Sequence, residues 1–233
     1  MATELVLIHG ALGSKEQLDF LVEWSKTMNL KPTVVEFSGH GTTKRSHSFS
    51  VTQFASELEN VLEILPESPL VFGYSMGGYV ALDLAARKPQ LFAGLITLAT
   101  KFNWSPEIAS KEVKMLSPSV IQDKVHAFAE VLDNRHKKIG WETVCRDTAS
   151  MMIDLGNEPL ITEEVLQSIS IPTVFSVGDE DKMVTIDETA WAQKNCPKSN
   201  LAVLPLTKHP IERLSQNTFT YLVKNLQEKV GLR

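Results

Sequence analysis

A serine stands in a short glycine-rich segment, Gly73-Tyr74-Ser75-Met76-Gly77-Gly78, which fits the pattern G-x-S-x-G. An apolar, strand-like run precedes this segment and a helical pattern follows it. A sharp turn from strand to helix strains the serine backbone and lifts its hydroxyl clear of the sheet, and small flanking residues let strand and helix approach. We therefore predict that Ser75 is a nucleophile; the alternative is a glycine-rich turn that binds an anion or nothing.

A serine hydroxyl is a poor nucleophile until a general base takes its proton and an acid orients that base. In a strand–helix arrangement of this kind, the acid and then the base follow the serine along the chain. Of the six histidines, only His209 follows the fifth strand-like run, and Pro210 biases it toward extended backbone in a loop. The acid is expected just after that run, where Asp179, Glu180 and Asp181 supply three carboxylates. Spacing alone does not choose among them.

Six short apolar runs alternate with helical patterns along most of the chain. The runs are apolar on both faces, as buried strands of a parallel sheet are, and the alternation predicts βαβ units. They span residues 5–8, 33–37, 70–72, 95–98, 173–177 and 201–204. The sequence therefore predicts an α/β fold built on parallel strands.

Residues 102–168 break this alternation, because they hold three or four helical patterns and no strand-like run. We expect a helical cap inserted into a core made of residues 1–101 and 169–233. Trp104, Trp141 and Met152 of the cap, with Leu12 from the loop after the first run, are candidates for contact with a substrate. The alternative for each is packing of the cap onto the core.

The charge balance argues against nucleic acid as a partner. Lys plus Arg is 23 and Asp plus Glu is 28, which gives a net charge of −5, whereas a nucleic-acid interface needs a basic face. The most basic stretch, Arg135-His136-Lys137-Lys138, is interpreted as a solvated helix end. The acidic start of the chain and the short apolar run 93–99 predict neither a signal peptide nor a membrane span, so a cytoplasmic location is expected.

The sequence predicts neither a metal nor an organic cofactor. The histidines lack the spacings of metal-binding motifs, and Cys145 and Cys196 lie far apart, so we expect both cysteines to be small buried residues. A dinucleotide-binding loop would need glycine at Leu12. His9 and His40 precede the serine, and we expect them to fix loops through hydrogen bonds rather than to act in catalysis.

Taken together, four motifs resemble the α/β-hydrolase family over essentially the whole chain. They are His9-Gly10-Ala11-Leu12-Gly13, which is similar to the family's oxyanion loop, Ser38-Gly39-His40-Gly41, the serine turn at 73–77, and Gly178-x-x-Asp181. The resemblance implies a three-layer α/β-hydrolase fold with a mostly parallel sheet of about six strands and a helical cap insertion. It also implies that the antiparallel hairpin with which many members begin is absent here.

The resemblance further implies a role for each candidate residue. The expected roles are nucleophile for Ser75, base for His209, acid for Asp181 with Asp179 as second choice, and backbone oxyanion donors at Ala11 and Met76. The expected reaction is cleavage of an ester or thioester of a small, largely apolar acyl compound through an acyl-enzyme.

Two other functions stay open on the sequence. A lyase or carbon–carbon hydrolase similar to the menaquinone-pathway synthase would use the same triad, but that enzyme carries an arginine where this chain has Tyr79. A receptor or scaffold of low turnover is the other alternative. The expected partners are a small-molecule substrate and, as an open possibility, a second copy of the chain.

Overall fold

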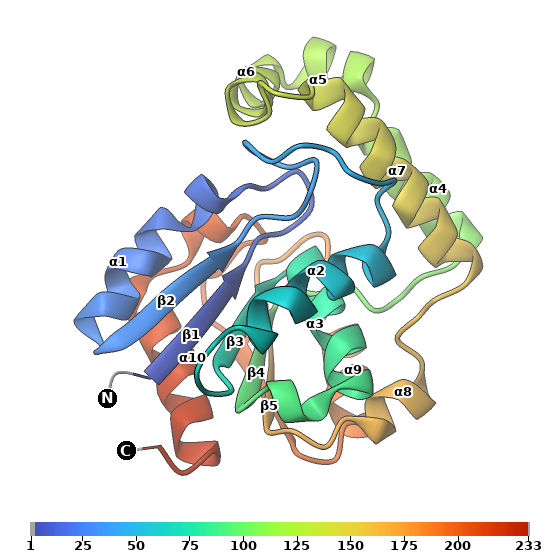
Figure 1. Ribbon diagram of the computed structural model, residues 1–233. Helices are drawn as coiled ribbons and strands as arrows, with labels where there is room; N and C mark the ends of the chain where they lie inside the picture. Colours follow the sequence, from blue (N-terminus) through green and yellow to red (C-terminus); the bar gives the residue numbers. More distant parts are fainter. Residues whose placement is uncertain (1–2, 233) are drawn as a thin grey trace.

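The computed structural model describes residues 3–232 and contains, within them, one six-stranded sheet in which every pairing is parallel (Figure 1). The strand order is β2-β1-β3-β4-β5-β6. The strands are β1 (Thr3–Ile8), β2 (Leu30–Val35), β3 (Leu70–Tyr74), β4 (Gly94–Leu98), β5 (Thr173–Gly178) and β6 (Ser199–Leu204). This sheet confirms the α/β fold and the parallel strands predicted from the apolar runs.

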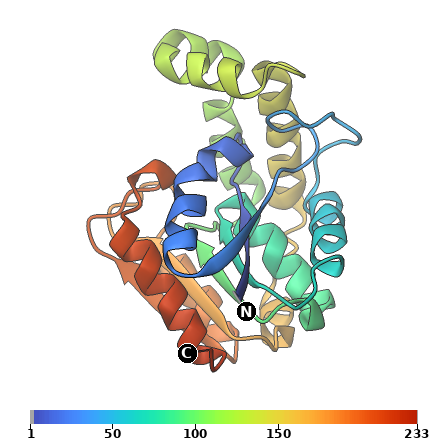
Figure 2. The ribbon, with the colours of Figure 1, turned by 60° about the vertical axis from the view of Figure 1, so that its left-hand side comes forward.

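Helices cover both faces of the sheet, which gives three layers (Figures 1 and 2). Helices α1 (Asp19–Thr27) and α10 (Gln216–Lys229) pack on one face, and their apolar side chains form a core with those of the central strands. Helices α2 (Val51–Glu63), α3 (Met76–Arg87) and α9 (Ile186–Asn195) cover the other face with a second apolar core. The central strands β3, β4 and β5 are buried throughout because both faces are covered.

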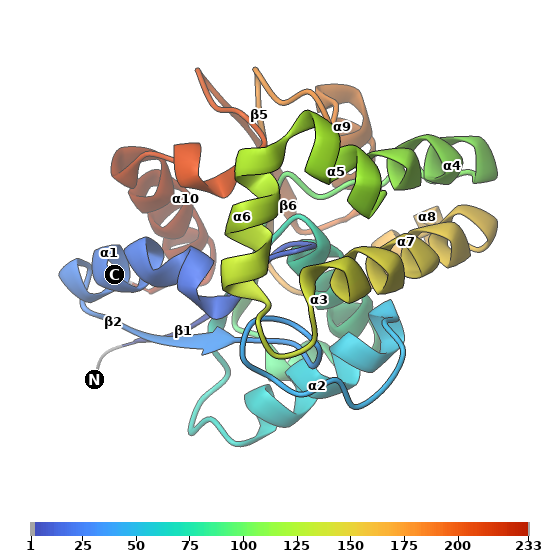
Figure 3. The ribbon, with the colours of Figure 1, turned by 90° about the horizontal axis from the view of Figure 1, so that it is seen from above.

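Five helices follow one another between β4 and β5, whereas the sequence suggested three or four helical patterns in residues 102–168. They are α4 (Pro106–Met115), α5 (Pro118–Lys124), α6 (His126–Arg135), α7 (Trp141–Asn157) and α8 (Glu163–Ser168). Seen from above, α4 to α7 lie over the edge of the sheet at which the strands end (Figure 3). We call these four helices the cap; α8 packs instead against α3 and α9 of the core.

Polar contacts hold the cap onto the core at several points. The guanidinium of Arg45 pairs with Asp147 of α7, with Nε and Oδ2 2.6 Å apart. The hydroxyl of Tyr79, on α3, accepts a hydrogen bond of 3.0 Å from the backbone N–H of Ile161. Tyr79 stands where the menaquinone-pathway synthase carries an arginine. In this chain its hydroxyl therefore fixes the segment that returns from the cap to the core.

Three short 3₁₀ turns, Lys15–Leu18, Pro89–Leu91 and Ile211–Arg213, complete the elements. Strand β2 begins at Leu30, earlier than the predicted start at residue 33, and includes Pro32. Proline is tolerated because β2 is an edge strand of the sheet. Cys145 and Cys196 are both buried, as expected. Within residues 3–232, no helix has the length and apolar character needed to cross a bilayer.

Candidate active site

Ser75 occupies the turn between β3 and α3 in a strained conformation. Its φ is 50° and its ψ is −114°, a backbone region that residues other than glycine rarely adopt. The strain is held by hydrogen bonds on both sides: its N–H donates to the carbonyl of Leu98 at 2.8 Å, and its own carbonyl accepts from the hydroxyl of Thr100 at 3.0 Å. The surrounding structure therefore fixes the serine in the sharp bend that the motif predicts.

Close packing explains the glycines on both sides of the serine. A Cβ at Gly73 would lie 2.6 Å from Cα of Gly78, and a Cβ at Gly77 would lie 2.6 Å from the carbonyl oxygen of His9. Real Cβ atoms do not approach backbone atoms so closely, so strand, helix and neighbouring loop meet here only if both positions are glycine.

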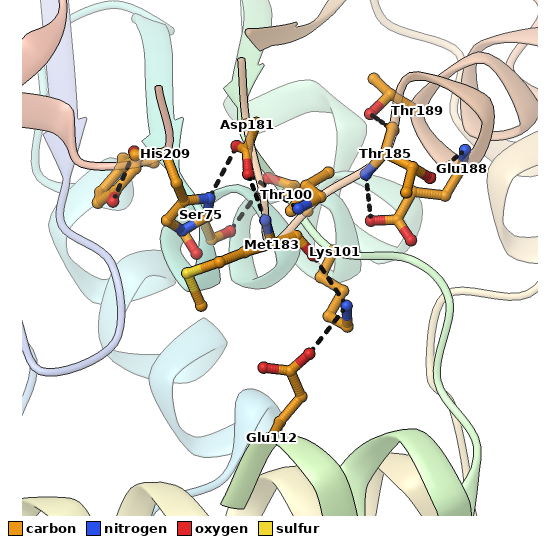
Figure 4. A network of polar contacts seen from close by, with 12 residues as sticks. Ser75, Thr100, Lys101, Glu112, Asp181, Met183, Thr185, Glu188, Thr189 and His209 are labelled. Atoms are coloured by element: carbon orange, nitrogen blue, oxygen red, sulfur yellow. Dashed lines mark hydrogen bonds and ion pairs between the residues drawn. The ribbon is translucent and has the colours of Figure 1, made fainter. Parts of the chain in front are cut away.

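His209 and Asp181 meet although 28 residues separate them in the chain. Nδ1 of His209 lies 2.8 Å from Oδ2 of Asp181, and Figure 4 shows this contact beside Ser75. Because a carboxylate can only accept, Nδ1 carries the proton and Nε2 is left with a free lone pair. Ser75 and His209 line the same cavity. The three residues expected to form a triad are thus brought to one place.

The structure distinguishes the two aspartates between which spacing could not choose. Asp179 accepts a hydrogen bond of 3.3 Å from the N–H of Thr207 and is a turn residue. The side chain of Asp181 is fully buried, and its Oδ1 accepts from the N–H groups of Met183 at 2.8 Å and Val184 at 2.9 Å. Asp181, rather than Asp179, is therefore the carboxylate in contact with the histidine ring.

The electrostatic environment keeps Asp181 ionised. Burial alone raises the pKa of this carboxyl group, but the hydrogen bond and charge of His209, together with the two backbone N–H donors, outweigh burial and lower the pKa below its usual value. The hydroxyl of Tyr74 also donates 3.0 Å to the backbone carbonyl of His209. The imidazole is therefore held both by its ring and by its main chain.

The cavity at Ser75 has a volume of about 60 Å³ and a largely apolar wall. The candidate residues that line it are Ala11, Ser75, Met76, Trp104, Met152 and His209. Met151 of the cap lines it too, and four further lining residues, Lys101, Glu112, Met183 and Val184, were not expected from the sequence. Methionines from the cap and from the loop after β5 therefore line the same space.

Leu12 and Trp141 do not line the cavity, although both were candidates for contact with a substrate. Leu12 has a φ of 56°, and its side chain is buried in the apolar core. Trp141 begins α7 and is buried in the same core. Both side chains therefore pack the cap onto the core instead of contacting a substrate.

Lys101 and Glu112 form an ion pair that no sequence pattern predicts. Lys101 Nζ lies 3.2 Å from Oε1 of Glu112 on α4 and donates 3.0 Å to the carbonyl of Met183 (Figure 4). This one ammonium group therefore links the end of β4, the cap and the loop that carries Asp181. No pattern of spacing joins these positions, because they come together only in the folded chain.

The basic stretch 135–138 is a solvated helix end only in part, because Lys137 and Lys138 are exposed whereas Arg135 and His136 are not. His136 is fully buried, and its Nε2 donates to the carbonyl of Leu12 at 3.0 Å while its Nδ1 accepts from the N–H of Gly41 at 3.0 Å. Nη1 of Arg135 donates to the same carbonyl at 2.8 Å. The end of α6 thus fixes the loop after β1, which contains Ala11.

His9 and His40 hold loops, as expected. Nδ1 of His9 lies 2.8 Å from the carbonyl of Gly10, and its Nε2 accepts a hydrogen bond of 3.3 Å from the N–H of Phe37. His40 lies 4.8 Å from His9 and 6.0 Å from His136, measured between ring centroids. Burial lowers the pKa of His9 to about 4, that of His40 well below its ordinary value, and that of His136 in the same direction. The three rings are neutral in the folded protein.

These buried histidines predict a loss of stability in acid. The unfolded chain binds protons at its histidines near pH 6.5, whereas the folded chain resists protonation, so the free energy of unfolding should fall as the pH drops below about 6.5. For His9 alone, the shift to a pKa of about 4 corresponds to roughly 3 kcal/mol at pH 4. Urea unfolding at pH 7.5, 6 and 5 measures this slope.

His136→Gln, which cannot be protonated, should show a shallower slope than the wild type. A free energy of unfolding that is constant or rises from pH 7.5 to pH 5 contradicts the prediction.

The geometry offers a nucleophile, a base and an acid. Among residues 3–232, no group of three or more His, Cys, Asp or Glu side chains is arranged to hold a metal ion.

The three-layer parallel sheet with a serine in a strained strand–helix turn defines an α/β hydrolase. This chain belongs to the family described as serine aminopeptidase, S33 (Hydrolase_4), whose model matches residues 2–212. The match agrees with the family resemblance of the four motifs and establishes the chain as an enzyme of the hydrolase class.

Relatives of known name lie at low identity. The chain is 24% identical over 237 residues to a pimeloyl-[acyl-carrier protein] methyl ester esterase of Photorhabdus laumondii, covering 90% of this chain and 88% of the relative. It is 29% identical over 174 residues to the enzyme of the same name from Serratia marcescens, covering 70% and 63%.

Among solved structures, a thermophilic esterase from Thermogutta terrifontis superposes with a TM-score of 0.77 at 20% identity, over 98% of this chain and 90% of that chain. At this identity, the superposition supports the fold alone.

Proposed function

We propose that the protein is a serine esterase that cleaves a carboxylic ester of a small, largely apolar compound through an acyl-enzyme. The observation that carries the proposal is the hydrogen bond between Asp181 and His209 at a cavity that also contains Ser75. Relatives named as methyl ester esterases favour an oxygen ester over a thioester. The cap is proposed to act as a lid over the cavity.

The first half of the reaction acylates the serine. Oγ of Ser75 attacks the carbonyl carbon of the ester while Nε2 of His209 takes the hydroxyl proton. The carboxylate of Asp181 holds the proton on Nδ1 and stabilises the imidazolium that forms. Collapse of the tetrahedral intermediate breaks the bond to the alcohol oxygen, which leaves with the proton from His209. Water then attacks the acyl-enzyme by the same route and releases the acid.

The backbone N–H groups of Ala11 and Met76 are proposed to bind the oxyanion. Both residues line the cavity with Ser75, and neither amide donates to a protein acceptor within residues 3–232. Two free N–H groups beside a nucleophile are suited to a developing negative charge, and each such donor contributes about 3 kcal/mol to the stability of the transition state.

The walls of the cavity support an apolar substrate group. Met151, Met152 and Leu155 of α7 face it, and methionine adapts to varied apolar shapes. The charged side chains in the wall are Lys101 and Glu112, which neutralise each other. A substrate with several carboxylates, as a lyase related to the menaquinone-pathway synthase would need, finds no unpaired cation there.

Hydrolysis of simple esters by the purified protein tests the proposal. We expect turnover of nitrophenyl acetate and butyrate and of methyl butyrate, with slower turnover of the matching thioester and of alanyl nitroanilide, a substrate for an aminopeptidase. Turnover confined to the nitroanilide would overturn the esterase in favour of a peptidase. Reaction of Ser75 with a fluorophosphonate but no turnover of any ester would favour the lyase or the receptor.

His136 is proposed to position the oxyanion loop. His136→Phe keeps the ring shape but removes both hydrogen bonds to Leu12 and Gly41, so the loop that carries Ala11 should shift. Small displacements of a catalytic group cost up to about 100-fold, and we expect kcat to fall about 10- to 100-fold with a smaller change in KM.

His126→Phe at the exposed start of the same helix is the matched control and should retain wild-type kinetics. Equal kcat for the wild type and His136→Phe would remove His136 from the positioning of the loop.

The residue assignments of the triad and the oxyanion hole remain proposals. A cytoplasmic location, the absence of a nucleic-acid partner and a second copy of the chain as a partner stay predictions from the sequence.

A further inference from the structure

A second, larger hollow lies behind one wall of the catalytic cavity. It has a volume of about 740 Å³, compared with about 60 Å³ for the cavity at Ser75. Its lining comes from the two segments that join the cap to the core, residues 102–104 and 159–163, and from the start of α9. We call it the outer groove.

Trp104 is the one residue within 3–232 that lines both spaces. Two pairs of consecutive residues are also shared between the two linings. Lys101 lines the catalytic cavity and Phe102 the outer groove, and likewise Val184 lines the cavity and Thr185 the groove. The indole therefore stands where the two spaces come nearest to each other.

The volumes indicate why this partition matters for a substrate. Small-molecule sites usually enclose about 300–1,000 Å³, and the cavity at Ser75 is far below that range whereas the outer groove is within it. A cavity of about 60 Å³ has room for a reacting ester and a short chain only. A longer chain on the substrate must extend beyond this cavity, either to solvent or into a neighbouring space.

The indole of Trp104 packs against the apolar core but is not held by a hydrogen bond. Its Nε1 is shielded from solvent and has no hydrogen-bond partner among the described residues, although a buried indole N–H usually finds one. The residue is only half-buried, and Nζ of Lys101 lies 6.0 Å from the ring centroid. Rotation of this ring breaks no hydrogen bond, because the ring makes none.

We propose that Trp104 is a partition that sets the length of chain the enzyme accepts, and that the outer groove is the site of the distal part of longer substrates. The proposal rests on the esterase function proposed above and adds a residue that determines its specificity. Phe102, Ile161 and Trp191 give the groove apolar and aromatic walls suited to an alkyl chain.

Charged side chains in the lining of the groove limit which chains it takes. Glu163, Asp187 and Glu188 lie in its lining, so a chain that ends in a carboxylate would meet charges of its own sign. A neutral alkyl chain avoids this repulsion. Neutral esters are therefore the probes that report on the partition itself.

Chain-length profiles of Trp104→Ala test the proposal. Two series are assayed: nitrophenyl acetate, butyrate, octanoate and decanoate, which lengthen the acyl group, and methyl, butyl and octyl butyrate, which lengthen the alcohol. In one series, we expect kcat/KM for the longest ester relative to the shortest to rise at least tenfold over wild type, as the burial of about two additional methylene groups would give. Which series responds identifies the side of the ester that enters the groove.

Matched variants separate an opened passage from a larger cavity. Met152→Ala enlarges the catalytic cavity from the cap wall and leaves the partition in place, so its profile should shift less than that of Trp104→Ala. Adding Asn103→Trp to Trp104→Ala fills the outer groove and should return the profile toward wild type. Trp104→Phe, which keeps a ring, serves if the alanine variant does not fold, and its shift should be in the same direction but smaller.

The measurements test the esterase function and the role of Trp104 independently. Wild-type turnover of the short esters bears on the esterase function, whatever Trp104 does. If the short esters turn over but the profiles of Trp104→Ala match wild type in both series, or shift no more than those of Met152→Ala, the partition is overturned while the esterase stands. A long-chain gain that survives Asn103→Trp also overturns the outer groove as the binding site.

Discussion

Replacing Ser75 by Ala is expected to lower kcat for ester hydrolysis by about 10⁵-fold or more. The substitution removes the atom that forms the acyl-enzyme, and the remaining residues of a triad contribute little without it. What rate remains should come from binding and from the backbone donors at Ala11 and Met76, which still stabilise the attack of water. Steady-state kinetics with nitrophenyl butyrate measure the change.

The fold should survive this substitution, which makes the result interpretable. Alanine keeps the Cβ, so the strain at a φ of 50° is unchanged, and the hydroxyl of Ser75 makes no hydrogen bond to a described residue that would be lost. We expect the same thermal unfolding midpoint as the wild type within about 2 °C, a shift that corresponds to at most about 1 kcal/mol for a chain of this size. Near-normal turnover by a folded Ser75→Ala protein would remove the serine from the mechanism.

Asp181→Asn should have the second largest effect, a loss of about 10⁴-fold in kcat with little change in KM. The asparagine can still accept hydrogen bonds from the N–H groups of Met183 and Val184 through its Oδ1. Its amide NH₂ then faces Nδ1 of His209 and donates to it, so the proton of the ring moves to Nε2. In that tautomer the histidine cannot take the proton of Ser75.

Asp179→Asn is the matched control, two residues away in the same turn. Asp179 accepts only from the N–H of Thr207, and asparagine can do the same, so kcat should stay within a few-fold of wild type. Equal losses in both variants would indicate damage to the loop rather than loss of the acid. A larger loss of kcat in Asp179→Asn than in Asp181→Asn would show that Asp179, and not Asp181, is the acid.

Local physical rules were enough to predict the sheet and the serine turn. The strands are short, apolar on both faces and separated by helical patterns, and each of these features is visible in a few consecutive residues. The glycine pattern of the turn at Ser75 is equally visible, because it lies within six consecutive residues, although Gly77 is required by a contact with the distant carbonyl of His9. Strand β2 was predicted at residues 33–37 but spans Leu30–Val35. A proline such as Pro32 is compatible with an edge strand, and the edge position is not visible in the sequence.

Contacts between segments that are distant in the chain could not be predicted from consecutive residues. Asp179 and Asp181 have the same chemistry, and only the path of the loop decides which of them faces His209. Leu12 and Trp141 are apolar residues near the cap, but whether such a residue faces a cavity or a core depends on helix rotation by a fraction of a turn. His136 lies in a basic stretch of a kind that is usually exposed to solvent. It is nevertheless buried, and it contacts the loop at Leu12, 124 positions earlier in the chain.

The cap is coupled to the catalytic residues at two separate points. Lys101 connects Glu112 of α4 to the carbonyl of Met183, whose N–H in turn binds Asp181. On the opposite side, Arg135 and His136 bind the carbonyl of Leu12, next to Ala11. A movement of the cap would therefore displace both the loop that carries Asp181 and the loop that carries Ala11. This coupling joins segments that no single sequence motif contains.

The most direct measurement of the central claim is the site of covalent reaction with a fluorophosphonate, located by mass spectrometry of peptides from the labelled protein. The account predicts a single adduct on Ser75, formed rapidly by the wild type and at least about 100-fold more slowly by His209→Ala, in which no base takes the serine proton. An adduct on another residue, or labelling of Ser75 at the same rate with and without His209, would contradict it.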